Sequence, residues 1–185
     1  MPDAAPLDRS VLRRHLLAAR RDFAGTPAFQ AAEHALRQAL PALLGQLEPE
    51  LLGVYWPLGG ERGGEFDPGP LPWPRALPFA RRAPAAMHYR RWDGGEPAVR
   101  DECGIPASTG AAAVPDVVLV PCVGFTREGF RLGYGGGYFD RWLAEHPGVT
   151  SIGLAWSSAE ANFPVEAHDR ALTLILTERE LLAPE

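Results

Sequence analysis

Residues 117–143 decide the fold, and they read VVLVPCVGFTREGFRLGYGGGYFDRWL. The segment begins with consecutive apolar residues from Val117 to Val120, flanked on both sides by prolines. A short apolar run of this kind is typical of a strand that is buried on both faces, as in the centre of a parallel sheet. A glycine-rich turn follows, and we expect a helix after it, over residues 137–146.

Similar signals extend the pattern in both directions along the chain. Asp8 suits the N-cap of a first helix, and Thr26 with the proline after it predicts the start of a second. Pro41 predicts a kink or break in that second helix. Thr177 with Glu180 forms a capping box, which predicts a terminal helix. The expected helices cover residues 7–23, a stretch from Thr26, 137–146 and a stretch from Thr177, and the expected strands cover 51–56, 77–80, 86–92, 117–120, 151–156 and 172–176.

Strands that alternate with helices indicate an α/β fold. The length of 185 residues suits one domain. We therefore predict a single layered domain over residues 1–185, Rossmann-like, with a mostly parallel central sheet flanked by helices. Residues 57–76 are rich in glycine and proline, so we expect a long loop or crossover there. Ligands of such sheets bind outside the carboxyl ends of the strands.

The overall composition excludes several classes of protein. The formal net charge is −5, whereas nucleic-acid-binding domains usually carry a basic excess. No apolar run approaches the ~20 residues that a membrane span needs, and the N-terminal residues do not resemble a signal peptide. Cys103 and Cys122 lack the spacing of a metal site. We expect a cytoplasmic monomer that binds a small molecule and neither nucleic acid nor a membrane.

The glycine-rich turn has the composition of an anion-binding loop. Glycines at 133, 135, 136 and 137 let backbone N–H groups approach an anion closely, and the following helix directs the positive end of its dipole to the same place. Arg131 adds a guanidinium suited to phosphate oxygens, and Asp140 is placed to hold Mg²⁺. The segment lacks the Gly-Lys-Ser/Thr of a Walker A loop and is not a dinucleotide fingerprint. A flexible glycine hairpin with Asp140 capping its helix remains an alternative.

Three arginines of the first expected helix share one face. Arg9 and Arg13 are four residues apart, and Arg20 lies two turns further along. Such a face is either simply solvated or part of a small anion site, and periodicity alone does not decide between the two.

The segment over residues 118–143 resembles the signature of the 5-formyltetrahydrofolate cyclo-ligase family, also called methenyltetrahydrofolate synthetases. That signature has a strand ending in Val-Pro-Gly, then Phe-Asp-x-x-Gly-x-Arg-Leu-Gly, a glycine-rich run and Tyr-Tyr-Asp. Weaker similarities to the family occur at Arg9-x-x-Leu12-Arg13, Tyr55-Trp56-Pro57 with Glu65-Phe66-Asp67, Gly104-Ile105-Pro106, and Glu166-Ala167-His168-Asp169.

The resemblance implies that ATP and Mg²⁺ drive the cyclisation of 5-formyltetrahydrofolate to 5,10-methenyltetrahydrofolate. Phosphorylation of the formyl oxygen would create a leaving group, and the N10 amine would close the ring. Two alternatives remain open. One is an enzyme of the same fold that acts on a thiamine-related or sugar-phosphate substrate. The other is a nucleotide-binding module without catalysis.

The resemblance also implies roles for individual residues. Arg131 and Tyr138 would act in catalysis, and Asp140 and Asp169 would bind Mg²⁺. Trp56, Tyr134, Tyr138 and either Glu61 or Glu65, with Glu65 favoured, would contact the folate. The ATP site would comprise Arg9, Arg13, Arg131, Gly133, Tyr134, Gly135, Gly136, Gly137, Tyr138 and Phe139.

Four positions differ from the family pattern. Arg9 stands where the family has lysine, and Phe139 replaces the second tyrosine and lacks its hydroxyl. Tyr134 and Gly136 stand where some members carry arginine and lysine, which leaves fewer charges in the glycine loop.

Overall fold

The computed structural model describes residues 8–59 and 63–184. A sheet in the order β12-β11-β10-β7-β1-β2-β3-β6 runs through its centre. Two further pairs of short strands, β4 with β5 and β8 with β9, lie outside this sheet. The strands are β1 (Leu52–Gly53), β2 (Arg75–Arg82), β3 (Ala85–Trp92), β4 (Val99–Arg100), β5 (Pro106–Ala107), β6 (Ala112–Ala113), β7 (Val117–Pro121), β8 (Gly124–Phe125), β9 (Arg131–Leu132), β10 (Thr150–Leu154), β11 (Leu174–Leu176) and β12 (Leu181–Leu182).

The middle of the central sheet is parallel. Neighbouring strands are parallel from β11 through β10, β7 and β1 to β2. On one side, β12 pairs antiparallel with β11. On the other side, β3 pairs antiparallel with β2, and β6 pairs antiparallel with β3. β7 is buried at every residue, as its unbroken apolar run predicts. The prediction of an α/β fold with a mostly parallel sheet is therefore confirmed.

The helices are α1 (Arg9–Ala24), α2 (Pro27–Leu47) and α3 (Tyr138–Glu145), with a 3₁₀ turn over Ser157–Ala159. Asp8 caps α1 by accepting hydrogen bonds from the backbone N–H groups of Ser10 and Val11. Thr26 caps α2 with its side chain. Both predicted N-caps are thus confirmed. Within the described ranges, no helix is long and apolar enough to cross a membrane.

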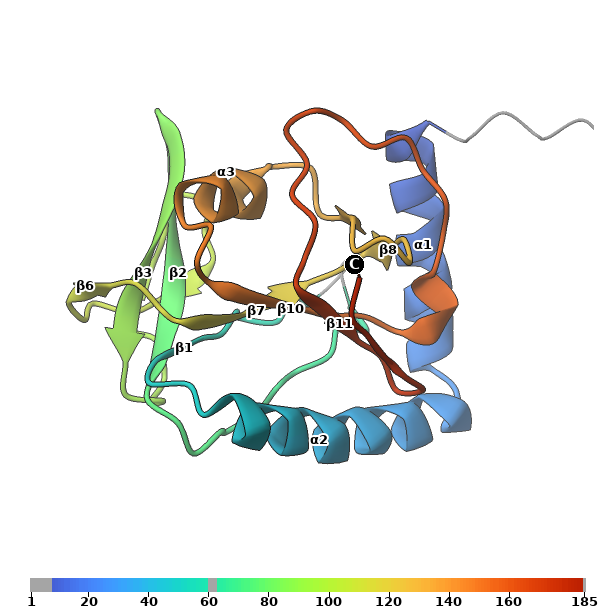
Figure 1. The fold of residues 1–185 in the computed structure, drawn as a ribbon, viewed down its shortest axis with the longest axis horizontal. Helices are drawn as coiled ribbons and strands as arrows, with labels where there is room; N and C mark the ends of the chain where they lie inside the picture. The colour runs from blue at the N-terminus through green and yellow to red at the C-terminus, as the bar shows by residue number, and fades with distance from the viewer. Residues whose placement is uncertain (1–7, 60–62, 185) are drawn as a thin grey trace, which may run out of the picture.

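Helices cover the two faces of the sheet (Figure 1). α2 packs on one face, where its leucines meet Val117 and Leu119 of β7. α3 lies against the other face, where Trp142 and Leu143 belong to the same cluster as Val118 and Val120. Successive residues of β7 thus point to opposite faces of the sheet, as in any strand, and both faces are covered by a helix. α1 lies at the edge of the molecule (Figure 1), where Phe23 packs against the α2 side of the core. Its Leu12 packs with Leu132 of β9 and with Phe163.

Two expected features are wrong. α2 continues through Pro41 without a break, because the burial of Leu36, Leu40 and Leu44 against the sheet outweighs the lost backbone hydrogen bond. No helix follows Thr177 among the described residues, since Leu181–Leu182 forms β12.

The terminal capping box instead closes a turn. The Thr177 hydroxyl accepts the backbone N–H of Glu180 at 3.0 Å, as a cap would, but the chain then pairs with β11. A single short turn of helix is marginal in water, whereas an added strand buries Leu182 and completes hydrogen bonds along the sheet.

Candidate active site

A cavity of about 960 Å³ opens beyond the carboxyl ends of the central strands. Pro121 at the end of β7 and Tyr55 and Trp56 after β1 reach its wall. Helix α1, the β2–β3 hairpin, the glycine loop over residues 133–137 and the segment over residues 166–170 supply much of the rest. The remaining lining residues come from the segments around Glu65 and Cys103, from Arg131 and from the start of α3. These elements lie far apart in the sequence, and the sheet brings them to one place.

The glycine loop has the backbone conformation that its composition predicts. Gly135 and Gly137 adopt left-handed φ angles of 95° and 62°, which other residues rarely adopt. In the described part of the chain, the amide N–H groups of Gly135, Gly136 and Gly137 donate no hydrogen bond. Gly137 is also the N-cap of α3, so unpaired amides and the positive end of the helix dipole coincide at this point.

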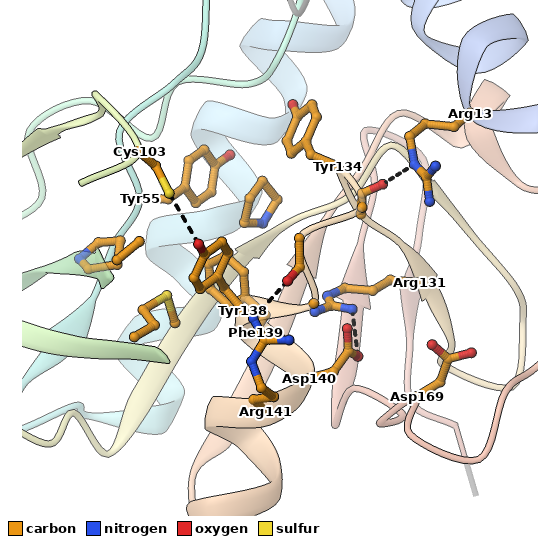
Figure 2. A pocket seen from close by; sticks show the side chains of 18 of the residues that line it. Arg13, Tyr55, Cys103, Arg131, Tyr134, Tyr138, Phe139, Asp140, Arg141 and Asp169 are labelled. Carbon is orange, nitrogen blue, oxygen red and sulfur yellow. Dashed lines mark hydrogen bonds and ion pairs between the residues drawn. The ribbon is translucent and has the colours of Figure 1, made fainter. Parts of the chain in front are cut away.

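Arg13 lies directly against this loop. Its Nε donates to the carbonyl oxygen of Gly133 at 2.7 Å (Figure 2). Burial, and then the nearby charge of Arg9, lower the pKa of Arg13, and within residues 8–59 and 63–184 no carboxylate pairs with it. A positive group that lacks a counter-charge and loses hydration is suited to bind an anion.

Arg131 and Asp140 form a buried ion pair. Nη1 of Arg131 lies 2.9 Å from Oδ1 of Asp140, and their side chains are 4% and 12% exposed. The Nε of Arg131 is buried with no hydrogen-bond partner among the described residues. A buried donor without a partner is costly. It fits a site whose remaining acceptor arrives with a ligand.

Arg9 binds the second predicted metal ligand. Its guanidinium contacts both carboxylate oxygens of Asp169, at 2.5 and 3.1 Å. The hydrogen bonds that Arg9 donates to Asp169 raise the pKa of Arg9. Burial would raise the pKa of Asp169, but the hydrogen bonds from Arg9 and from the backbone of Glu166 outweigh it, and the pKa is lowered. Both groups therefore stay charged at neutral pH.

The carboxylates fit a metal ion that arrives with phosphates. Asp140 and Asp169 both line the cavity, and each is paired with an arginine. Among the described residues, no three His, Cys, Asp or Glu side chains form a metal-binding group. Mg²⁺ typically keeps several waters and takes only one or two carboxylates besides substrate phosphates. The donor set suits such an ion better than one held by protein ligands alone.

The opposite wall of the cavity is aromatic and includes Glu65. Trp56, Glu65 and Tyr134 all line it. Glu65 accepts a hydrogen bond from the Tyr134 hydroxyl and another, at 2.7 Å, from the backbone N–H of Leu58. Glu61, the other glutamate considered from the sequence, lies outside the described residues.

Tyr138 contacts a cysteine that carried no functional signal in the sequence. The Tyr138 hydroxyl lies 3.2 Å from Sγ of Cys103, and this contact raises the pKa of the tyrosine. The ring of Phe139, the next residue, faces the Arg131 guanidinium, with 5.6 Å between the ring centroid and Cζ of Arg131. Figure 2 shows Cys103 and Tyr55 on one side of the glycine loop and Arg13 and Asp169 on the other.

Two residues beside the site carry no clear functional signal in the sequence. The spacing of Arg20 on its helix is equally compatible with a solvated face, yet only 6% of Arg20 is exposed, and it donates a hydrogen bond to Tyr134 in the cavity wall. Cys103 was considered only as half of a metal pair. Asp101 orients Cys103 by accepting its backbone N–H at 2.8 Å. An aspartate followed by Gly104, which has a left-handed φ of 81°, is a turn signal that could have drawn attention to this segment.

Comparison with known proteins identifies similar sequences. The model of the 5-formyltetrahydrofolate cyclo-ligase family matches residues 77–178. The 5-formyltetrahydrofolate cyclo-ligase of Mycolicibacterium smegmatis is 32% identical over 95% of this chain and 96% of its own length. The protein of that name from Mycoplasma pneumoniae is 38% identical over a shorter stretch, 34% of this chain and 39% of its own length.

Solved structures of 5,10-methenyltetrahydrofolate synthetases share the fold. The Aquifex aeolicus protein superposes with a TM-score of 0.73 at 25% identity, over 95% of this chain and 92% of its own. A Mycoplasma pneumoniae protein superposes with a TM-score of 0.70 at 22% identity, over 93% of this chain and 99% of its own.

Proposed function

Because the chain belongs to the 5-formyltetrahydrofolate cyclo-ligase family, we propose that it converts 5-formyltetrahydrofolate into 5,10-methenyltetrahydrofolate with ATP and Mg²⁺. One observation carries this proposal beyond family membership. A loop whose glycine amides donate to no group among the described residues, flanked by Arg13 and Arg131, shares one cavity with an aromatic wall that includes Glu65. The cavity thus offers an anion site beside a site for a flat polar ring.

The reaction requires activation of an unreactive formamide. Transfer of the terminal phosphoryl group of ATP to the formyl oxygen converts that oxygen into part of a good leaving group. The N10 amine then attacks the formyl carbon, loses its proton, and expels inorganic phosphate, which leaves ADP as the other product. No covalent bond to the protein is needed, so the residues contribute positioning and neutralisation of charge.

The triphosphate would lie along the glycine loop. The backbone amides from Gly133 to Phe139 would donate to its oxygens, with Arg9 and Arg13 reaching in from α1. Arg131 would present its unpaired Nε to the transferred group, and its partner Asp140 holds the guanidinium in that orientation. This arrangement supports a catalytic role for Arg131.

Asp140 and Asp169 would hold Mg²⁺ together with the phosphates. The ion would supply charge neutralisation on the triphosphate. To ligate it, each carboxylate would use an oxygen lone pair that its arginine partner leaves available.

The folate would occupy the aromatic side of the cavity. Glu65 would accept from the paired N–H donors of the pterin, with Trp56 and Tyr134 beside the ring. Tyr138 would lie next to the formyl group, where its raised pKa keeps the hydroxyl protonated as a donor.

The test is direct observation of the product. Purified protein mixed with Mg·ATP and 5-formyltetrahydrofolate should produce the long-wavelength absorbance of the methenyl product. Omission of ATP, or of Mg²⁺ in the presence of a chelator, should abolish it. Nucleotide binding without this absorbance would instead favour a non-catalytic module, and turnover of ATP only with another substrate would favour a different enzyme of the same fold.

The enzyme would act in the cytoplasm as a monomer. A cytoplasmic monomer without a nucleic-acid or membrane partner is compatible with the net charge of −5. Size-exclusion chromatography with light scattering at several concentrations tests the monomer, because a mass of twice 20.0 kDa would contradict it.

A further inference from the structure

A chain of hydrogen bonds joins α1, the glycine loop and the segment after β1. Nη2 of Arg20 donates to the hydroxyl oxygen of Tyr134 at 2.9 Å. The Tyr134 hydroxyl in turn donates to Oε1 of Glu65. The other carboxylate oxygen of Glu65 accepts the backbone N–H of Leu58 at 2.7 Å. Both oxygens of this carboxylate are therefore fixed in direction.

Burial determines which group donates in each of these hydrogen bonds. Arg20 is 6% exposed, and its Nε also donates to the carbonyl oxygen of Gly63 at 3.2 Å. Burial and the charge of Glu65 raise the pKa of Tyr134. Its hydroxyl therefore stays protonated at working pH, accepts from Arg20 and keeps its own proton for Glu65. Hydrogen bonds that involve charged groups are the stronger ones, so the position of Tyr134 constrains that of Glu65.

We infer that Arg20 and Tyr134 are positioning residues that couple the nucleotide loop to the folate-binding carboxylate of Glu65. The inference rests on the proposed function. Tyr134 lies between Gly133 and Gly135, whose backbone would hold the triphosphate. A nucleotide bound to this loop would restrict the motion of Tyr134 and, through its hydroxyl, of Glu65, so folate binding would cost less conformational entropy. By linkage, each ligand tightens the binding of the other by the same factor.

The experiment measures that factor directly. The dissociation constant of 5-formyltetrahydrofolate is determined by calorimetry with and without a saturating non-hydrolysable ATP analogue and Mg²⁺. In the unmodified protein the analogue should tighten folate binding by about fivefold or more. In Tyr134→Phe the ring stays but the hydroxyl is lost, so the ratio should fall to about one, while the protein still binds the analogue through the loop backbone.

Two further variants make the result specific. Tyr89→Phe is a matched control, because Tyr89 is fully buried and its hydroxyl has no hydrogen-bond partner among the described residues. It should leave the coupling factor at the unmodified value. Arg20→Lys keeps the charge but loses the guanidinium fork, so it should lower the factor without abolishing binding of either ligand.

The outcomes separate this inference from the function on which it rests. An unmodified protein that binds the analogue but not 5-formyltetrahydrofolate would contradict the proposed function itself. An unmodified protein that binds both, with a coupling factor that Tyr134→Phe leaves unchanged, would overturn only the positioning role. If Tyr134→Phe does not fold, Arg20→Lys provides the same comparison, and an unchanged factor in that variant overturns the inference.

Discussion

At the scale of single residues, the decisive feature is that the two carboxylates expected to bind Mg²⁺ are each paired with an arginine. Arg131 is paired with Asp140 and Arg9 with Asp169. Removal of one member of a buried pair leaves the other as an uncompensated charge. Substitutions at these positions should therefore separate by how far they lower the free energy of unfolding in addition to their effect on the reaction rate.

Asp140→Asn and Arg131→Ala test this separation. Both should lower the rate of methenyl formation by about 100-fold or more. Asp140→Asn should lower the free energy of unfolding by less than Arg131→Ala does, because it removes the countercharge of Arg131 but keeps an amide oxygen that accepts its hydrogen bond. Arg131→Ala should lower it by about 3 kcal/mol, because it leaves Asp140 buried and unpaired. Rates come from product absorbance and stabilities from urea unfolding.

Arg127→Ala is the matched control for the stability measurement. Arg127 also binds carboxylates, Glu160 and Glu180, but its side chain is 52% exposed. Exposed pairs contribute about 0–1 kcal/mol. An equal loss of stability in Arg127→Ala and Arg131→Ala would show that burial of the pair is not what matters.

At the scale of elements, helix α1 is joined to the segment over residues 166–170 by Arg9 and Asp169. The lowered pKa of Asp169 gives this connection a pH dependence. A carboxyl group whose pKa is lower in the folded state stabilises above its unfolded pKa, and this stabilisation is lost as pH falls through the folded value.

Asp169→Asn should therefore remove a pH-dependent part of the stability. At pH 7 the variant should be less stable than the unmodified protein, and the difference should shrink at pH values below about 4, the ordinary aspartate pKa. Urea unfolding of both proteins from pH 7 to pH 3 measures this. A difference that stays constant, or that grows in acid, would contradict the assigned role of the carboxylate in joining the two elements.

Helix α2 gives a second test, because it contains a proline that does not break it. Pro41→Ala restores a backbone donor inside the helix, at a position where proline is unfavourable. Allowing for the greater freedom of the unfolded chain, the variant should be more stable by about 1–2 kcal/mol.

Pro27→Ala is the control within the same helix. Pro27 is the first residue of α2, where proline costs no hydrogen bond and its fixed φ suits the helix. Pro27→Ala should be neutral or slightly less stable than the unmodified protein when it and Pro41→Ala are compared by thermal unfolding. Stabilisation by both substitutions would show that proline is unfavourable throughout α2, for a reason unrelated to the interior hydrogen bond.

At the scale of the whole molecule, the cavity is assembled from elements on both sides of the sheet. A ligand that contacts α1, the glycine loop and the β2–β3 hairpin would hold these three elements together. Such a ligand stabilises the native state in proportion to the logarithm of its concentration.

A non-hydrolysable ATP analogue with Mg²⁺ should thus raise the melting temperature in a concentration-dependent manner. At about 100 times its dissociation constant it should add about 2.7 kcal/mol. Asp140→Asn should retain the shift caused by the nucleotide alone but lose most of the further shift caused by Mg²⁺. An Mg²⁺ effect of normal size in that variant would remove Asp140 from the metal site.

Local patterns in the sequence determined most of the secondary structure and the central motif. The apolar run of β7, the caps at Asp8 and Thr26, and the glycine loop before α3 each depend on neighbouring residues, so each was predicted from short segments. The terminal hairpin was not, because Thr177 with Glu180 suits a turn as well as a helix. Only the available edge of β11 decided between them.

The tertiary structure decided the partners of the charged and polar side chains. Arg9 meets Asp169 across 160 positions of sequence, and Tyr134 meets Glu65 across 69. Arg20 could not be distinguished from a solvated residue by its spacing on α1. These contacts form because the order of the strands in the sheet brings loops that are distant in the sequence to the same strand ends. Local sequence propensities carry no information about which loops lie together.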